Sequence, residues 1–224
     1  MLSIVIPTLD AGLRFGAVLA ALVPGAVAGL VKEVVVVDGG STDRTLELAE
    51  EAGCRILTAD RGRARQLRAG AAEARAEWLL FLHADTVLED GWIGAVERHM
   101  AERPGSVGWF RLRFDDASGF ARVWEAGVAF RSSVIGLPYG DQGLLIPRAL
   151  YDAVGGYPDV PLMEDVELVA TLGRARLSPL GAAAITDASK YRRDGWMARS
   201  FRNLMLITAW GMGVKPHRLA SLYD

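Results

Sequence analysis

The amino-terminal part of the chain alternates short apolar runs with amphipathic stretches. The apolar runs lie at residues 2–6, 33–38, 55–58 and 77–82. Runs of this length with few polar positions inside are typical of strands buried on both faces, as in a parallel sheet. Helical periodicity lies between them, at residues 12–22, after Thr42 and at residues 61–75. The alternation predicts parallel strands with helices on both faces, and Pro24-Gly25 is expected to end the first helix.

This regular alternation ends after Asp90. The later segments predict a helix at 91–102, a strand at 107–114, a helix or long loop at 120–132, a loop at 136–143, a strand at 144–147, and helices at 148–154, from 162 and at 196–214. In the strand at 107–114, Trp109, Arg111 and Arg113 alternate with apolar residues, which predicts one face in water. Since no repeat and no linker interrupts the chain, we expect a single α/β domain over residues 1–224.

Polar side chains follow three of the predicted strands. Thr8 and Asp10 follow the first, Asp38 ends the second, and His83 and Asp85 follow the fourth. Because the carboxyl ends of parallel strands meet at one edge of a sheet, these groups are expected to gather at a ligand-binding crevice. A carboxylate in such a position can instead cap a turn or a helix, so both roles stay open for Asp38 and Asp85.

The composition narrows the classes of protein. The chain has 224 residues, 51% of them hydrophobic, and a net charge of −2, which allows a real core and argues against a nucleic-acid binder. Cys54 is the single cysteine, which excludes an internal disulfide and a cysteine-rich zinc site. We see no signal-peptide pattern and no run long enough to cross a membrane, so we expect a cytoplasmic protein.

Five segments, in a definite order, carry a family pattern. They are residues 3–8 (Ser-Ile-Val-Ile-Pro-Thr), 36–45 (Val-Val-Asp-Gly-Gly-Ser-Thr-Asp-Arg-Thr), 80–85 (Leu-Phe-Leu-His-Ala-Asp), 140–142 (Gly-Asp-Gln) and 163–168 (Met-Glu-Asp-Val-Glu-Leu). Together they resemble the family-2 glycosyltransferases of the GT-A fold, within it the transferase 2 branch associated with radical-SAM/selenodomain proteins. The resemblance implies a Rossmann-like nucleotide-sugar-binding half at 1–90, an acceptor half at 91–190 and a C-terminal helical segment at 191–224.

On the donor side, the resemblance implies a site for a UDP- or GDP-sugar. The nucleotide-contacting residues that it implies are Pro7, Thr8, Asp10 and Asp38. Asp85 matches the last aspartate of the family's Asp-x-Asp motif, which implies that it binds Mn²⁺ or Mg²⁺ together with the donor diphosphate. His83 stands at the first acidic position of that motif. Metal ligation, contact with the donor and simple packing all stay open for its imidazole.

On the acceptor side, the resemblance implies roles for the acidic pair Glu164-Asp165. Asp165 would be the general base that deprotonates the acceptor hydroxyl, and Glu164 would orient it or touch the donor sugar. The alternative is that both residues are acidic because the helix dipole favours negative charge at the start of a helix. Asp141 and Gln142, in a glycine-flanked loop, are expected to shape the pocket.

Two basic segments are expected near the donor phosphates. Arg65 belongs to a run of arginines at a predicted helix start, where a phosphate partner would explain the positive charge. Arg193, in the later Arg192-Arg193 pair, is expected to clamp the diphosphate. A solvated basic face is the alternative for both segments.

The predicted helix at 196–214 carries more apolar residues than a solvated helix tolerates and too few to span a bilayer. Its apolar residues must therefore be covered by the domain itself, by a second copy of the chain, or by the inner face of a membrane. The last of these would suit a lipid-linked acceptor. Cover by protein is the first expectation.

The resemblance implies an inverting, metal-assisted hexosyltransferase that uses a nucleoside-diphosphate sugar and an acceptor hydroxyl. One alternative is a nucleotidyltransferase, but such enzymes carry a glycine-rich basic loop where this chain has Pro7-Thr8-Leu9-Asp10. The other alternative is a catalytically silent nucleotide-sugar-binding protein, which His83 at an acidic position keeps open.

Overall fold

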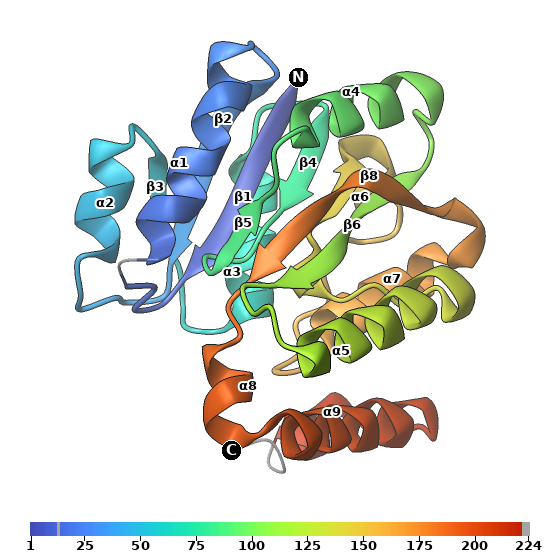
Figure 1. Ribbon diagram of the computed structural model, residues 1–224. Coiled ribbons are helices and arrows are strands. Elements are labelled where there is room, and N and C mark those ends of the chain that lie inside the picture. The colour runs from blue at the N-terminus through green and yellow to red at the C-terminus, as the bar shows by residue number, and fades with distance from the viewer. Residues whose placement is uncertain (13, 221–224) are drawn as a thin grey trace.

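The computed structural model describes residues 1–12 and 14–220, and it has a central sheet with helices on both faces (Figure 1). The strands are β1 (Leu2–Thr8), β2 (Val31–Asp38), β3 (Arg55–Thr58), β4 (Trp78–Phe81), β5 (Thr86–Leu88), β6 (Val107–Phe114), β7 (Leu144–Pro147) and β8 (Leu177–Thr186). The helices are α1 (Arg14–Val27), α2 (Thr45–Glu51), α3 (Arg63–Glu73), α4 (Trp92–Glu102), α5 (Gly119–Phe130), α6 (Arg148–Ala153), α7 (Glu164–Leu172), α8 (Ser189–Asp194), α9 (Trp196–Gly211) and α10 (Pro216–Ala220). Short helical turns are η1 (Arg131–Ile135), η2 (Gly140–Gln142) and η3 (Arg174–Arg176). Residue 13 of the predicted first helix and residues 221–224 of the predicted C-terminal segment lie outside the described residues.

The sheet has the strand order β3-β2-β1-β4-β7-β6-β8-β5. The amino-terminal strands β3, β2, β1 and β4 are parallel, and Thr8 of β1 pairs with Asp38 of β2. Strand β7 is antiparallel to both β4 and β6, whereas β6 and β8 are parallel. The predicted α/β class is therefore confirmed, and the parallel order of the amino-terminal half is confirmed with it, while the whole sheet is mixed.

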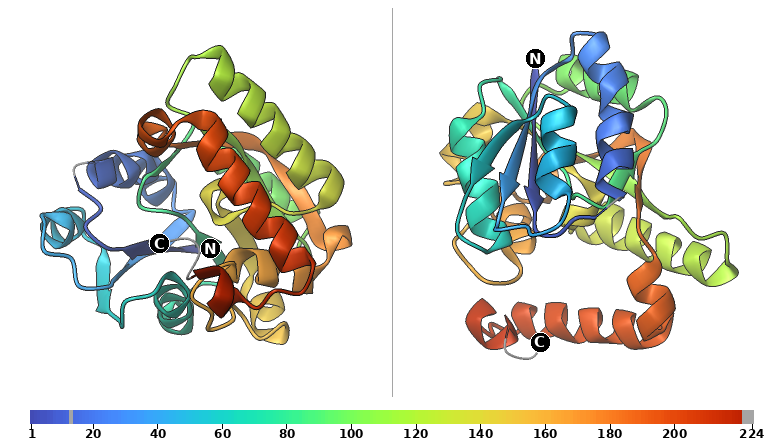
Figure 2. Two further views of the ribbon diagram at one scale, coloured as in Figure 1. Left: turned by 90° about the horizontal axis from the view of Figure 1, so that it is seen from below. Right: turned by 90° about the vertical axis from the view of Figure 1, so that its left-hand side faces the viewer.

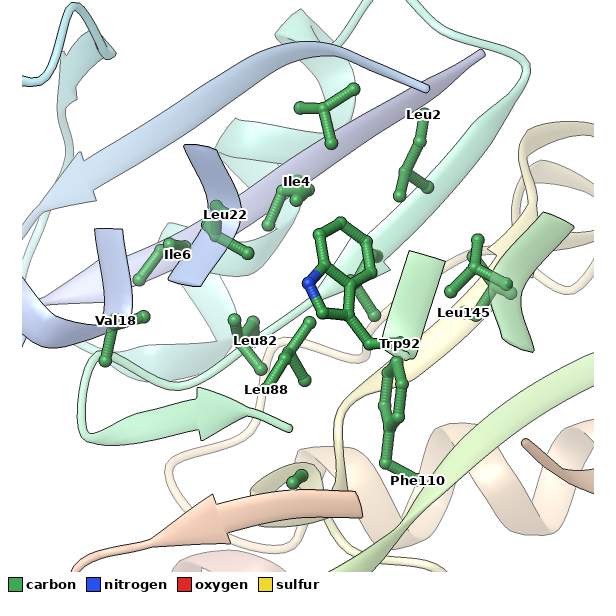
Figure 3. Packing of buried hydrophobic residues seen from close by; sticks show 14 of the residues in the cluster. Leu2, Ile4, Ile6, Val18, Leu22, Leu82, Leu88, Trp92, Phe110 and Leu145 are labelled. Carbon is green, nitrogen blue, oxygen red and sulfur yellow. The ribbon is translucent and has the colours of Figure 1, made fainter. Parts of the chain in front are cut away.

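Alternate side chains of the buried strands build a core on each face of the sheet. Ile4 faces the layer of α1, α2 and α4, and Val5 faces the layer of α3, α6 and α7. On the first face, Trp92 packs among apolar side chains of the sheet and of α1 (Figure 3). The amino-terminal strands are thus held rigidly, and their carboxyl ends are held with them.

Three details of the sequence prediction are wrong or incomplete. Helix α1 continues through Pro24 to Val27. The Trp92 Nε1 donates to the Ala21 carbonyl of this helix (3.1 Å), and the Trp92 ring rests on Gly25, where a Cβ would lie only 2.5 Å away. The predicted wet face of β6 includes Trp109, which is only 3% exposed, whereas Arg111 on the same face is exposed. Strands β5 and β8 were not predicted at all.

The C-terminal helices leave the end of β8 and pass below the sheet. Helix α9 lies at the lower end of the molecule in Figure 1, close to α5, and both views of Figure 2 agree. This places α9 below the carboxyl ends of the strands. Within the described residues, no helix is both long enough and apolar enough to cross a membrane.

Candidate functional site

Two adjoining hollows open at the carboxyl ends of β1 and β4. The first, here the β1 hollow, measures about 490 Å³ and lies between residues 7–11 after β1 and the start of α3. The second, here the α9 hollow, measures about 210 Å³ and lies between η2, the start of α7 and α9. Arg63, His83, Asp85 and Asp187 line both hollows. Because they share these walls, the hollows form one continuous site.

The floor of the β1 hollow is built by the loops that follow β1 and β2. Asp10 has a left-handed backbone (φ 48°), and its carboxylate accepts a hydrogen bond from the Thr42 N–H (2.8 Å). The Ser41 hydroxyl accepts one from the Asp10 N–H (2.9 Å). The Gln66 Nε2 of α3 donates to the carbonyl of Thr8 (2.7 Å) and to the carbonyl of Val37 in β2 (2.8 Å). Pro7, Thr8 and Asp10 all line this hollow, and these hydrogen bonds hold their backbone in place.

Asp38 is buried below that floor, and its carboxylate is already occupied. It accepts hydrogen bonds from the N–H groups of Gly40 (2.9 Å) and Ser41 (2.8 Å), from the Ser41 hydroxyl, and from Thr8 (3.0 Å). Burial alone would raise the pKa of Asp38, but these hydrogen bonds outweigh it and lower the pKa. Asp38 lines neither hollow, so this geometry favours its turn-capping role.

Asp85 and His83 stand just after β4, half-buried on the shared wall. The backbone of Gly140 comes so close to His83 that a Cβ there would lie 2.7 Å from the His83 Nε2. Among the described residues there is no group of three or more His, Cys, Asp or Glu side chains arranged for a metal. A carboxylate such as Asp85 is still the oxygen ligand that Mg²⁺ and Mn²⁺ take when phosphates complete the shell.

Asp165 lies on the other side of Gly140, in the first turn of α7. Its Oδ2 accepts a hydrogen bond from the Gly140 N–H (2.7 Å), and its Oδ1 accepts one from the Val166 N–H (2.8 Å). A Cβ at position 140 would lie 3.3 Å from the Asp165 Oδ2. Only glycine fits between His83 and Asp165 without displacing one of them, so the turn η2 sets the position of the Asp165 carboxylate.

Glu164, the neighbour of Asp165, forms an ion pair with Arg63 of α3. Glu164 is 1% exposed, and its burial raises its pKa while Arg63 opposes that shift. Burial would lower the pKa of Arg63, but the carboxylates of Glu164 and Asp165 outweigh it and raise the pKa. The ion pair therefore joins α3 to α7, and it fixes the protonated guanidinium of Arg63 on the wall that both hollows share.

Asp141 adds a third carboxylate to the α9 hollow. Its Oδ1 is buried without a hydrogen-bond partner among the described residues. Burial raises the pKa of Asp141 to about 6; Arg131 opposes the shift, and the negative charges of Asp165 and Asp85 add to it. The carboxylates of Asp85, Asp141 and Asp165 are thus close enough to interact.

The chain matches a known protein family. The model of the family "Glycosyl transferase family 2" matches residues 3–153, which is most of the strands that carry the site. The chain belongs to glycosyltransferase family 2. The predicted family is thereby confirmed, whereas its radical-SAM-associated branch stays a prediction. No curated protein sequence matches the chain.

Solved structures of this glycosyltransferase fold resemble the chain at low sequence identity. Staphylococcus aureus TarS has a TM-score of 0.66 at 18% identity, and the match covers 93% of this chain and 39% of TarS. Glucosyl-3-phosphoglycerate synthase from Mycobacterium tuberculosis, in complex with Mn²⁺, UDP and phosphoglyceric acid, has a TM-score of 0.59 at 19% identity, covering 80% and 67%. The chain thus spans about two fifths of the length of TarS. These likenesses support the GT-A fold.

Five of the residues expected in the transferase site lie outside both hollows: Asp38 and Glu164, described above, and Arg65, Arg193 and Gln142. Arg65 is exposed and pairs with Asp159 (3.1 Å), because a helix turns about 200° between Arg63 and Arg65. Arg193 is exposed and pairs with Asp194 (2.7 Å). Gln142 is fully buried, and its side chain hydrogen-bonds groups of η1, of Tyr139 and of β6.

Other residues of the site were not singled out from the sequence. The missed lining residues include Arg63, Asp187, Tyr139, Tyr191, Arg199 and Asn203. Arg63 belonged to the basic run that was recognised, but only the helix direction shows which member faces inward. Arg199, Asn203 and Leu206 follow the spacing i, i+4, i+7, which puts them on one face of α9 and was the available signal.

Proposed function

We propose that the chain is an inverting glycosyltransferase that moves a sugar from a nucleoside-diphosphate sugar to an acceptor hydroxyl. The observation that carries the proposal is the shared wall of the two hollows. Asp85 and Arg63 line both hollows, and Asp165 lines the α9 hollow beside them. This arrangement suits a donor in the β1 hollow, with its sugar end toward Asp165, and an acceptor in the α9 hollow.

The β1 hollow suits the nucleoside diphosphate. The nucleoside would lie between Pro7–Asp10 and the start of α3, with its diphosphate beside Arg63 and Asp85, where a guanidinium matches phosphate oxygens. The synthase structure that resembles this chain contains UDP and Mn²⁺ by its description. UDP-sugars are therefore the first donors to test, and GDP-sugars are the second.

A divalent cation, Mn²⁺ or Mg²⁺, fits the ligand that the shared wall offers. Asp85 would hold it together with the donor diphosphate, because one carboxylate plus phosphate oxygens is an ordinary shell for these ions. When bound, the cation supplies the positive charge that neutralises the leaving diphosphate. The imidazole of His83 lies at the same wall and stays a candidate for either the cation or the donor.

Asp165 suits the general base of the reaction. The acceptor hydroxyl gives its proton to the Asp165 carboxylate while its oxygen forms a bond to the anomeric carbon. The bond from that carbon to the phosphate oxygen breaks, and the nucleoside diphosphate leaves with the electron pair. Attack from the face opposite the leaving group inverts the anomeric centre. The Gly140 and Val166 N–H groups keep the Asp165 carboxylate oriented for this step.

The α9 hollow suits a hydroxylated ligand. The Asp141 Oδ1 and the Arg199 Nε are buried there, and neither has a hydrogen-bond partner among the described residues. Buried polar atoms without partners cost stability, and a bound sugar or polar acceptor would supply the missing partners. Asp141 and Arg199 are therefore the groups that we expect to read the transferred sugar or the acceptor.

A donor panel tests the function. UDP- and GDP-sugars are incubated with the protein and Mn²⁺ or Mg²⁺, and release of the nucleoside diphosphate is measured. Slow hydrolysis of one donor, accelerated by hydroxyl acceptors, is the expected result. Tight binding of a donor without any release would instead identify a nucleotide-sugar-binding protein.

Replacement of the metal-binding carboxylate gives a sharper prediction. Asp85→Ala should remove the metal dependence of UDP or GDP binding, measured by titration calorimetry with and without Mn²⁺, and should leave the unfolding midpoint within a few degrees. Asp152→Ala, an exposed aspartate on α6, is the matched control and should bind like the wild type. Unchanged metal dependence in Asp85→Ala would remove the metal assignment.

A further inference from the structure

Helix α9 has two faces of opposite character. One face carries Arg199, Asn203 and Leu206 into the α9 hollow, and Leu206 is its buried residue among those described. The opposite face is apolar and open. Its exposed side chains are Met197 (75%), Phe201 (64%), Leu204 (61%) and Met205 (57%), followed by Met212 (75%) just after the helix. Their spacing of three, four and seven or eight residues puts them on one stripe.

Helix α5 adds a second apolar stripe at the same end of the molecule (Figures 1 and 2). Phe120, Val123 and Phe130 are 64%, 69% and 61% exposed. Val134 and Ile135 of η1 continue this stripe. Exposed aromatic and aliphatic side chains gathered at one end of a protein mark a surface that binds something apolar.

The segment that contains α9 is basic, although part of its charge is paired: Arg192 pairs with Asp115 and Asp116, and Arg193 and Arg199 pair with Asp194. Residues 189–219 contain seven lysines and arginines and one aspartate, a net charge of +6. The whole chain has a net charge of −2, so the remaining residues sum to −8. Residues 195–219, which include all of α9, contain no acidic residue.

We propose that the stripes of α9 and α5 dock this end of the protein on an anionic lipid surface. An open apolar stripe in a basic segment is the pattern of a helix that lies in a membrane interface, where anionic headgroups attract the cations. A second copy of the chain fits less well, because a two-fold interface through α9 would bring two segments of net charge +6 together. The inference stands on exposed residues and charge, so it does not depend on the proposed transfer reaction.

This docking has a consequence for the acceptor. The apolar stripe and the lining of the α9 hollow lie on opposite faces of one helix, and a helix with its side chains is about 10–12 Å across. A lipid surface against the stripe is therefore about that far from Asn203. An acceptor hydroxyl carried on a lipid headgroup would be within reach of the hollow.

Vesicle flotation without any donor tests the proposal. The full chain is mixed with vesicles of phosphatidylcholine containing 30% phosphatidylglycerol, and with vesicles of phosphatidylcholine alone. We expect flotation with the anionic vesicles and at least tenfold weaker partition with the neutral ones. The double variant Phe201→Gln/Met205→Gln should partition at least tenfold less, while circular dichroism and the unfolding midpoint stay those of the wild type.

Val27→Gln is the matched control. Val27 is 83% exposed and ends α1, at the opposite end of the molecule from α9 (Figure 1), so this variant should float like the wild type. No flotation of the wild type, or equal flotation of the double variant, would overturn the proposal. A dimer in light scattering that the double variant dissociates, without flotation, would overturn it in favour of a second copy.

Discussion

Four of the five aspartates expected at the site differ in what already occupies their oxygens. Asp38 accepts hydrogen bonds from its own turn on both oxygens, whereas Asp165 accepts one N–H on each. Asp141 keeps an oxygen without a partner among the described residues, and Asp85 faces both hollows. A carboxylate can do chemistry only with lone pairs that the fold leaves available. The ranking of these residues as chemical groups therefore follows from their hydrogen bonds.

Asp165→Asn tests the base at this scale. The amide keeps the shape of the side chain but cannot take a proton, so turnover should fall by about 10²-fold or more, while donor affinity changes only a few-fold. Steady-state kinetics and donor titration measure the two quantities. Turnover close to that of the wild type would mean that Asp165 only begins a helix.

Asp141→Asn tests the buried carboxyl group. Burial raises the pKa of Asp141 in the folded state to about 6, from 3.8. The protonated carboxyl group therefore favours the folded state at low pH, and this contribution to the free energy of unfolding is lost as the pH rises from about 4 to 6. Asparagine does not ionise, so above pH 6 the variant should be more stable than the wild type by about 1–3 kcal/mol. Urea unfolding at pH 4, 5, 6 and 8 in EDTA measures this. A difference that does not change with pH would contradict the prediction.

At the scale of elements, the turn η2 acts as a wedge between the sheet and α7. The Gly140 N–H of this turn donates to the Asp165 carboxylate, and the Gln142 side chain fixes the turn to the residues around it. The Gln142 Oε1 accepts hydrogen bonds from Ser132 (2.8 Å) and Arg131 (3.1 Å), and its Nε2 donates to the Phe110 carbonyl (3.1 Å). Gln142 thus positions the acidic loop from outside the hollow.

Gln142→Ala should therefore destabilise the fold and displace the turn η2. Loss of the amide leaves several buried groups without partners, which should lower the free energy of unfolding by about 2–4 kcal/mol. Ser133→Ala, at an exposed position of η1, is the control and should cost less than about 0.5 kcal/mol. Denaturant unfolding compares the two, and equal stability of both variants would show that the amide does not fix the turn.

At the scale of the whole molecule, the site joins a rigid part and a loosely attached part. Strands β1 and β4 and helix α3 belong to the two large cores, whereas Leu206 is the buried residue of α9 among those described. The donor side of the site is thus preformed. The acceptor side is closed by a helix with few buried apolar contacts.

Hydrogen exchange should show this division. Amides of α9 should exchange at least tenfold faster than those of β1, because opening α9 exposes little buried apolar surface. Donor binding in the β1 hollow should leave α9 exchange nearly unchanged, and a ligand in the α9 hollow should slow it. Mass-spectrometric exchange with and without UDP measures both, and protection of α9 equal to that of β1 would contradict the prediction.

The sequence by itself determined the amino-terminal half of this protein. Continuous apolar runs can be satisfied only by strands covered on both faces, so the pattern predicted β1 to β4, and the polar residues at their ends marked the site. The family segments added Asp85 and Asp165, which do line the hollows. The signals were strong there because they were local.

Only the tertiary structure decided the rest. Strand β8 contains Ser178, Pro179 and Gly181 and is a strand because it pairs with both β6 and β5, not because of its residues. Asp38 takes the turn-capping role that the sequence had left open, because its own turn occupies its carboxylate. Arg63 and not Arg65 reaches the site because of helix direction, and Arg199 and Asn203 reach it because α9 folds back beneath the strands. The pairing of β8, the hydrogen bond from Gln142 to the Phe110 carbonyl and the position of α9 depend on contacts between residues far apart in the chain, which a local sequence pattern does not contain.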